Sequence, residues 1–510
     1  MTQTSPATMD PAAARGGPPN WLLIFLAVIT GLRLILAAAI PLTEDEAYYR
    51  LWAQGLQLGY YDHPPMIAWW IRAGMTMAGD NAFGIRLVPT LVCGLSGLLV
   101  FDLAKRLGAD VRTAARASLW YNATLVIGLG GNLATPDAAA TPFWILTLWC
   151  LARTRQTPGP AWWLGAGLAA GLACLSKYSA LFLAPGVVIW LVMSQERTAE
   201  LKRPWPWAAA LIAAALFGIN VAWNAQHHWV TFDKQFGRLA PHGLKPQYVL
   251  DLLLGQVLLL NPLITFFAIR GLKRPWDRAD GPGALNASLL VATSIPFATY
   301  LVFHALHDRV QAHWPVLVYP ALAIIAAAAA SRIPDKGWLA GLRRWTAPVG
   351  LALAGLVMIH LAVPATDIKG LNDPTGAIRG WPRFTLTVNT IRANSGAAWF
   401  GTVSYGAAAQ LDYAHADAPV VQILERDRYS PGDGSWRADM SRPGLIVDID
   451  RRLSAQALMT CFAKVEPYGY VVRQLGVSRP TRYALYRVEG PRRDVLHDGC
   501  AGPRGGPKPG

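Results

Sequence analysis

The loop that follows the first long apolar run holds the residues best suited to chemistry. Three consecutive carboxylates, Glu44, Asp45 and Glu46, come directly after an apolar run that ends near residue 42. Ionisable groups are costly in or beside a bilayer, so acids placed there often belong to a functional site. Such a carboxylate can take a proton from a hydroxyl group or bind a cation. The simpler explanation is that the acids only stabilise the positive N-terminal end of the next helix.

Aromatic residues crowd the same loop, and stabilisation of a helix end does not explain them. Tyr48 and Tyr49 follow the acids, and the run YYDHPP occupies residues 60–65. We expect one short helix over 46–56 and a second over 65–74, both lying along the membrane interface. The density of aromatic and charged side chains in this loop therefore favours a binding site.

Three later polar segments adjoin apolar runs. Asp137 follows a proline, which is an ordinary helix start as well as a candidate site. His227 and His228 lie in the segment Asn224–Arg238. Neighbouring residues on a helix point apart, which disfavours a metal ion shared by the two histidines, and the alternative is a structural or hydrogen-bonding role. Arg309 suits a phosphate group, and simple attachment to the interface is the alternative.

The composition indicates a membrane protein. Of the 510 residues, 53% are hydrophobic and 15% are charged, whereas soluble domains usually carry about 25% charged residues. The net charge of +15 would suggest nucleic-acid binding if it formed one patch. Lys and Arg instead occur in small clusters between the apolar runs, which is typical of a multi-pass membrane protein. We therefore expect no nucleic-acid partner.

The apolar runs predict an all-α membrane bundle. A spanning helix needs about 20 mostly apolar residues. The basic clusters fall in alternate loops, which by the positive-inside rule predicts an inner-membrane protein with a cytoplasmic N-terminus and a periplasmic C-terminal region. We place about eleven spans, near residues 20–42, 83–104, 116–132, 138–152, 161–176, 178–194, 206–223, 248–269, 286–305, 314–331 and 345–364.

The predicted domains follow from this topology. Residues 1–19 form a disordered cytoplasmic tail, 20–365 form the transmembrane domain, and 43–82 form its first periplasmic loop. A small α/β periplasmic domain occupies 366–500, and a disordered tail occupies 501–510.

Short runs in the C-terminal domain predict its secondary structure. Cys461 and Cys500 can form a disulfide if this domain is periplasmic, and the sequence leaves their pairing open. We expect strands at 445–449, 468–475 and 483–488, and helices at 406–414 and 454–463.

The motifs of the first loop resemble those of a known family. The run Asp45-Glu46-Ala47-Tyr48-Tyr49, followed by Tyr60-Tyr61-Asp62-His63-Pro64-Pro65, is similar to the bacterial branch of the dolichyl-phosphate-mannose protein mannosyltransferase superfamily. Its members are membrane glycosyltransferases of the C-type fold, and they include the lipid A aminoarabinose transferase and rhizobial galacturonosyl transferases. Pro136-Asp137, the 224–238 segment and Arg309 also match in order, so the resemblance covers roughly residues 20–330.

This resemblance implies transfer of a sugar from a polyprenyl-phosphate donor, most often undecaprenyl phosphate in bacteria. The expected acceptor is periplasmic: lipopolysaccharide or lipid A, another envelope glycan, or a protein. The family's catalytic base corresponds to Asp45, with Glu46 as its catalytic neighbour, and attack opposite the phosphate would invert the anomeric carbon. The residues expected to bind the donor sugar and phosphate are Tyr48, Tyr49, Tyr61, Asp62, His63, Asp137, Arg238 and Arg309.

One position departs from the family pattern. The aminoarabinose transferase has an acid followed by Lys before the Pro pair, whereas this chain has Asp62-His63. A histidine replaces a lysine's charge only when it is protonated. The chemistry is compatible with a divalent metal but does not require one, and Asp62, His63, His227 and His228 are weak candidate ligands.

Two other classes of function remain open at the level of sequence. A transporter or flippase predicts ionisable residues deep within the spans and repeated halves. The acids here lie at the ends of spans, and no repeat is evident. A non-catalytic receptor or assembly factor leaves the acidic first loop without a role.

Overall fold

The computed structural model describes residues 16–237, 243–273, 285–363, 374–428, 437–474 and 480–500. The chain divides into two compact units. The first, which we call the helical unit, comprises Met1–Ala37, His63–Ile67 and Arg86–Ile359. The second, the sheet unit, comprises Ala38–Asp62, Ala68–Ile85 and His360–Gly510. Of the two predicted tails, residues 1–15 and 501–510 lie outside the described residues.

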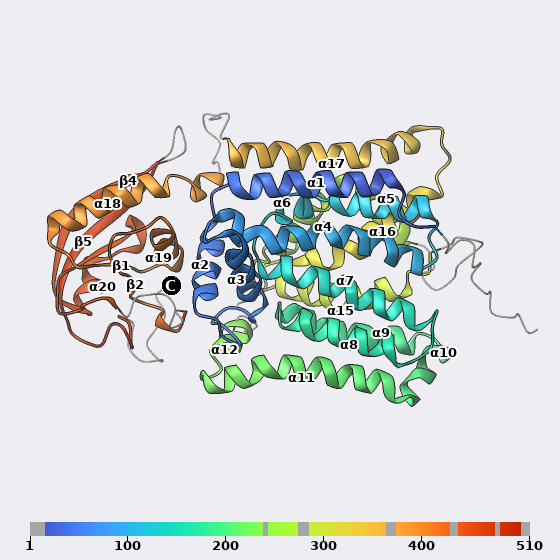
Figure 1. Cartoon of the computed structure of the whole chain (residues 1–510), viewed down its shortest axis with the longest axis horizontal. Helices are drawn as coiled ribbons and strands as arrows, with labels where there is room; N and C mark the ends of the chain where they lie inside the picture. Colours follow the sequence, from blue (N-terminus) through green and yellow to red (C-terminus); the bar gives the residue numbers. More distant parts are fainter. Residues whose placement is uncertain are drawn as a thin grey trace, which may run out of the picture. The chain divides into compact units, whose positions relative to one another are not determined.

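Packed helices build the helical unit (Figure 1). Helix α8 packs against α7 and α11, and α16 packs against α5 and α14. Gly167 of α8 lies against the backbone of Ala209 in α11, where a larger side chain would not fit. Small residues at such a contact let two helices approach closely. The helices, with η for 3₁₀, are α1 (Asn20–Ala39), α4 (Ala82–Arg106), α5 (Val111–Asn122), α6 (Leu125–Gly130), α7 (Pro136–Thr154), α8 (Pro160–Cys174), η1 (Tyr178–Phe182), α9 (Leu183–Val192), α10 (Gln195–Thr198), η2 (Ala199–Lys202), α11 (Pro204–Gln226), α12 (Val230–Phe236), α13 (Gln247–Leu259), α14 (Pro262–Leu272), α15 (Ser288–Ala305), η4 (Trp314–Val318), α16 (Tyr319–Ser331) and α17 (Trp338–Ala362).

Several of these helices can cross a membrane. In the described part of the chain, six helical segments are long and apolar enough, and the number rises to eight if two bent pairs each count as one span. The protein is therefore a multi-pass membrane protein by length and composition of its helices. The six segments are Asn20–Ala39, Ala82–Arg106, Pro204–Gln226, Ser288–Ala305, Trp314–Ser331 and Trp338–Ala362.

Two of the spans predicted as single helices are broken. The predicted span 248–269 is the pair α13 and α14, which meet at an angle of 108°. Asn261 at the break has a φ of 81° and its side chain caps α14, while the following Pro262 lacks the N–H that a continuous helix needs. The predicted span 116–132 is likewise divided into α5 and α6, because the Thr124 side chain accepts a hydrogen bond from the Ile127 N–H and starts a new helix.

The sheet unit is built on a five-stranded mixed sheet (Figure 1). The strand order is β2-β1-β3-β5-β4; β1 is parallel to β2 and β3, and β5 is antiparallel to β3 and β4. Both faces are covered, since Phe400 and Leu445 pack in one apolar cluster and Trp399 and Ile446 in another. The strands are β1 (Trp399–Thr402), β2 (Val420–Gln422), β3 (Gly444–Ile449), β4 (Phe462–Arg473) and β5 (Thr481–Pro491).

The helices of the sheet unit come from both ends of the chain. Helices α2 and α3 belong to the first loop and match the two short helices expected there, and α2 packs against α19. The predicted strands and helices of the C-terminal region are also present, except that the predicted helix 454–463 ends at Met459 and β4 begins at Phe462; β1 and β2 were not predicted. The helices are α2 (Glu44–Gln54), α3 (Met66–Ala78), η5 (Pro374–Ile378), α18 (Trp381–Ser395), α19 (Tyr405–Tyr413), η6 (Arg426–Arg428), η8 (Asp450–Arg452) and α20 (Ala455–Met459).

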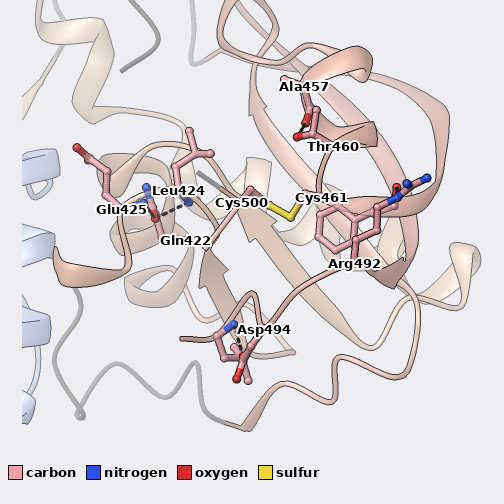
Figure 2. The surroundings of a disulfide bond; sticks show 11 residues. Gln422, Leu424, Glu425, Ala457, Thr460, Cys461, Arg492, Asp494 and Cys500 are labelled. Atoms are coloured by element: carbon pink, nitrogen blue, oxygen red, sulfur yellow. Dashed lines mark hydrogen bonds between the residues drawn. A yellow bond between two sulfur atoms is a disulfide. The ribbon is translucent and has the colours of Figure 1, made fainter. Parts of the chain in front are cut away.

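A disulfide joins Cys461 and Cys500 in the sheet unit (Figure 2). It fixes the end of the described chain beside strand β2, since the Cys500 N–H donates to the Ile423 carbonyl at 2.5 Å. Arg426 reinforces this connection because its Nε donates to the Leu496 carbonyl at 2.9 Å. The disulfide therefore holds the segment that leads from β2 to η6.

Candidate active site

A capped helix start presents the acids of the first loop. The Thr43 side chain accepts a hydrogen bond from the Glu46 N–H, and the Glu46 carboxylate accepts from the Thr43 N–H at 3.0 Å, which is a complete capping box. Glu46 is fully buried by this arrangement. Asp45, one residue earlier, is exposed. The sequence prediction paired these two as catalytic residues, but the fold gives them different environments: Glu46 closes the helix end, and Asp45 is accessible.

Tyr405 is the residue that contacts the Asp45 carboxylate. Its hydroxyl donates a hydrogen bond to Oδ1 of Asp45 at 2.8 Å. Burial and the nearby carboxylate both raise the pKa of the Tyr405 phenol far above its usual value, so the phenol keeps its proton and stays a donor. Within the described residues, the other oxygen of Asp45 makes no hydrogen bond.

A buried carboxylate fixes the start of α19, the helix that Tyr405 begins. Oδ2 of Asp448 accepts hydrogen bonds from the Val403 N–H at 2.9 Å, the Ser404 N–H at 2.8 Å and the Ser404 hydroxyl at 2.7 Å. Asp448 itself is fully buried in β3. Burial raises its pKa, and these hydrogen bonds oppose that rise. The residues immediately before Tyr405 are thus tied to the central strand of the sheet.

A buried ion pair links the first loop to the C-terminal residues. Arg428 lies 2.7 Å from the Asp62 carboxylate, and their side chains are 8% and 14% exposed. Arg428 also pairs with Glu425. Its guanidinium stacks over the rings of Tyr61 and Tyr405, each at 4.7 Å. Burial lowers the pKa of Arg428, but the surrounding carboxylates outweigh it and the net pKa lies above its usual value.

Arg50 fastens α2 to its neighbours. Its guanidinium binds Asp80 through two nitrogens at 2.6 Å and Asp412 through a third at 2.6 Å. Asp80 follows α3, and Asp412 belongs to α19. Gln410 of α19 adds a hydrogen bond to the Leu42 carbonyl at 2.9 Å. These contacts hold the start of α2 beside the start of α19, so they position Asp45 against Tyr405.

Two of the predicted sugar-binding tyrosines are buried. Tyr48 is 1% and Tyr49 is 6% exposed, so neither ring is open to a sugar in this structure. The Tyr48 hydroxyl donates to the Arg428 carbonyl at 3.1 Å, and its ring lies 5.0 Å from that of Tyr405. Both rings pack within the sheet unit, and their binding to a sugar stays a prediction. Tyr61 is partly exposed and is the remaining candidate of the three.

The helical unit carries a second charged cluster. Lys177 Nζ lies 2.6 Å from Oδ1 of Asp137, and both side chains are nearly buried. His313 Nε2 approaches the other oxygen of Asp137 at 3.7 Å. Asp137 is in the first turn of α7, and Lys177 stands at the break between α8 and η1. This break brings a cation to a carboxylate 40 residues earlier in the chain.

The other predicted residues lie in the helical unit or outside the described residues. Arg309 is exposed on the loop after α15, and its backbone N–H donates to the Asp308 side chain. His227 directs Nδ1 to the Trp223 carbonyl at 2.7 Å and stacks on the Trp223 ring. His63 is partly buried in the helical unit. Arg238 lies outside the described residues.

The weak metal candidates do not assemble into a site. In the described ranges, no group of three or more His, Cys, Asp or Glu side chains is placed to hold a metal ion. Asp62 is bound to Arg428, and His228 has a left-handed backbone with a φ of 55°. No cofactor is assigned to these residues.

Sequence reasoning missed Tyr405, Arg428 and Lys177. Nothing in the local pattern marks Tyr405 or Arg428, because they become neighbours of the first loop only through the fold. Lys177 did carry a signal. It lies between predicted spans 161–176 and 178–194, in a turn on the expected outer side, where the positive-inside rule disfavours a lone lysine.

Comparisons with known proteins agree with the family suggested by the first loop. Residues 62–223 match the family model described as "Dolichyl-phosphate-mannose-protein mannosyltransferase". The chain is 30% identical to the lipid A galacturonosyltransferase RgtD of Rhizobium johnstonii over 290 residues, which covers 55% of this chain and 59% of that protein. It therefore spans less than two thirds of that relative's length.

A longer match and a solved structure extend the likeness. The chain is 24% identical over 427 residues to the undecaprenyl phosphate-alpha-4-amino-4-deoxy-L-arabinose arabinosyl transferase of Pseudomonas paraeruginosa, covering 68% of this chain and 74% of that one. The crystal structure of ArnT from Cupriavidus metallidurans bound to undecaprenyl phosphate superposes with a TM-score of 0.62 at 14% identity, over 92% of this chain and 98% of that one. This likeness shows the fold. The family resemblance seen in the sequence is confirmed.

Proposed function

We propose that this chain, a member of the dolichyl-phosphate-mannose-protein mannosyltransferase superfamily with the C-type glycosyltransferase fold, transfers a sugar from a polyprenyl-phosphate donor to an acceptor hydroxyl in the periplasm. The donor class is supported by the relatives, whose names include undecaprenyl-phosphate-linked aminoarabinose and lipid A as substrates. We propose undecaprenyl phosphate as the carrier and lipid A or another envelope glycolipid as the acceptor.

The observation that carries this proposal is the environment of Asp45. It is an exposed carboxylate at the start of a capped helix, with one oxygen held by Tyr405 and the other open among the described residues. A general base needs an accessible oxygen and a fixed orientation. Glu44 and Glu46 do not combine these properties, since Glu46 closes the cap and Glu44 is partly buried. Burial also raises the pKa of Glu44.

The reaction follows from the base and the leaving group. Asp45 takes the proton of the acceptor hydroxyl as its oxygen forms a bond to the anomeric carbon. The bond between that carbon and the phosphate oxygen breaks, and the polyprenyl phosphate leaves with the electron pair. Attack from the side opposite the phosphate inverts the anomeric configuration. Phosphate departs readily as an anion, so the protein needs no acid for it but gains from cations. From the sequence resemblance, we assign this role to Arg309.

We place the sheet unit in the periplasm. The Cys461–Cys500 disulfide supports this orientation, because disulfides persist in the oxidising periplasm and are rare in the cytosol. The clusters of Lys and Arg in alternate loops support a cytoplasmic N-terminus, because the positive-inside rule places such clusters on the cytoplasmic side. The acceptor would then be a molecule of the outer side of the inner membrane.

Sugar transfer by the purified full chain in detergent tests the proposal. Wild type, Asp45→Asn and the control Asp417→Asn are each offered a panel of undecaprenyl-phosphate sugars with lipid A and core glycolipid as acceptors. Asp417 forms an ion pair with Arg392 and is 43% exposed, so its variant controls for the loss of one carboxylate. We expect wild type and Asp417→Asn to transfer a sugar.

Asp45→Asn should lose at least about a hundredfold in kcat, the order of magnitude of general-base catalysis. Full activity of the Asp45→Asn protein would refute the base assignment. Absence of transfer by wild type across the whole panel, from protein that still binds the lipid donor, would refute the transferase function itself.

A further inference from the structure

The hydroxyl of Tyr405 makes the one hydrogen bond that the Asp45 carboxylate receives among the described residues. Asp45 lies in the first loop, and Tyr405 lies 360 residues later in the C-terminal part of the same unit. We propose that Tyr405 is a positioning residue for the catalytic base, so that the C-terminal region takes part in catalysis by orienting Asp45. This inference depends on the proposed function, in which Asp45 is the base.

An exposed aspartate needs such a partner because its terminal torsion is soft. The χ2 angle of Asp is broad and roughly two-fold, so a carboxylate at the surface samples many orientations. A hydrogen bond from Tyr405 to Oδ1 selects one orientation and leaves Oδ2 to receive the proton of the acceptor. Misplacement of a reacting group by about 1 Å can cost about a hundredfold in rate.

Several contacts restrain the Tyr405 side chain, so its hydroxyl can hold the Asp45 carboxylate in one orientation. The ring packs against Tyr48 at 5.0 Å and lies under the Arg428 guanidinium at 4.7 Å. The preceding residues, Val403 and Ser404, are pinned to the buried Asp448. A side chain fixed by packing and by a second layer of hydrogen bonds orients its partner better than a mobile one.

The neighbouring Glu44 fits the same arrangement. Gly406, the residue after Tyr405, leaves the space that the Glu44 carboxylate occupies, since a Cβ at position 406 would lie 2.3 Å from its Oε2. The start of α19 therefore contacts the start of α2 at two neighbouring residues: Tyr405 binds Asp45, and Gly406 packs against Glu44. The contact is a fitted surface and not one isolated hydrogen bond.

The test is a double-mutant cycle on sugar transfer by the full chain. Tyr405→Phe keeps the ring and removes only the hydroxyl, and Tyr468→Phe is the matched control, because Tyr468 is 40% exposed on β4 of the same unit. We expect Tyr405→Phe to lower kcat by about ten- to hundredfold, as for a lost hydrogen bond to a charged group. The KM for the donor should stay within about twofold, and Tyr468→Phe should match wild type.

The Asp45→Asn background distinguishes positioning from other roles. If Tyr405 acts through Asp45, Tyr405→Phe causes no further loss there, because residues that work as a unit are not additive. An equal fractional loss in both backgrounds, or an unchanged kcat in the single variant, overturns the inference while Asp45 remains the base. Full activity of Asp45→Asn overturns the proposed function instead.

A second variant keeps the test decisive if Tyr405→Phe does not fold. Asp448→Asn leaves the Tyr405 hydroxyl in place but weakens the hydrogen bonds that pin Val403 and Ser404. We expect a smaller loss in kcat, about two- to fivefold, with the donor KM unchanged. A kcat equal to wild type in a folded Asp448→Asn protein, in which α19 starts less rigidly, contradicts the positioning role.

Discussion

The buried pair of Asp62 and Arg428 should stabilise the sheet unit far more than an ordinary surface pair. Asp62→Asn removes the carboxylate 2.7 Å from Arg428, where the two side chains are only 14% and 8% exposed. Removing one partner of a buried pair typically costs about 3–5 kcal/mol. Glu425 still binds Arg428 in this variant, so we expect a smaller loss of about 2–3 kcal/mol. For a unit of about 150–250 residues, this lowers the unfolding midpoint by roughly 4–12 °C.

The matched control is Asp417→Asn, which breaks the pair of Asp417 and Arg392. That pair has similar geometry, with Arg392 Nε 2.9 Å from the carboxylate, but Asp417 is 43% exposed. Exposed pairs contribute about 0–1 kcal/mol, because water screens the charges. The assay is protease cleavage of the sheet unit as a function of temperature, with the full chain in detergent. Equal shifts for the two variants would refute the argument that burial sets the energy of these pairs.

Two further predictions concern the disulfide and the helix cap. Replacing Cys461 and Cys500 together by Ala should destabilise the sheet unit by about 2–4 kcal/mol, since the disulfide joins residues 39 positions apart in the chain. The same protease-cleavage assay measures this loss of stability. An unchanged unfolding midpoint would contradict the prediction. Glu46→Gln should keep nearly full transfer activity, because Gln also completes a capping box. Glu46→Ala should destabilise α2 by about 0.5–2 kcal/mol. If Glu46→Gln instead loses most of its transfer activity while its stability is unchanged, Glu46 is a catalytic carboxylate.

The first-loop helices are features that the local sequence predicts correctly. Thr43 followed three residues later by Glu46 is a capping box in sequence as well as in structure, so the start of this helix follows from local chemistry. The same local rules did not predict the break within span 248–269. The hydropathy of that segment is continuous, and the break depends on Asn261, whose side chain also donates to the Thr346 carbonyl at 2.8 Å from a distant helix.

By itself, the sequence determined the membrane class, the family resemblance and the acidic first loop, because apolar length, basic loops and short motifs are properties of neighbouring residues. Only the tertiary structure decided which acid is accessible and what surrounds it. Tyr405 and Arg428 meet Asp45 and Asp62 across more than 350 residues of chain, and no periodicity or propensity encodes a contact at that separation. Such contacts form only when packing of α2 on α19 brings the two segments together, so the partners of the proposed base were visible in the fold and not in the sequence.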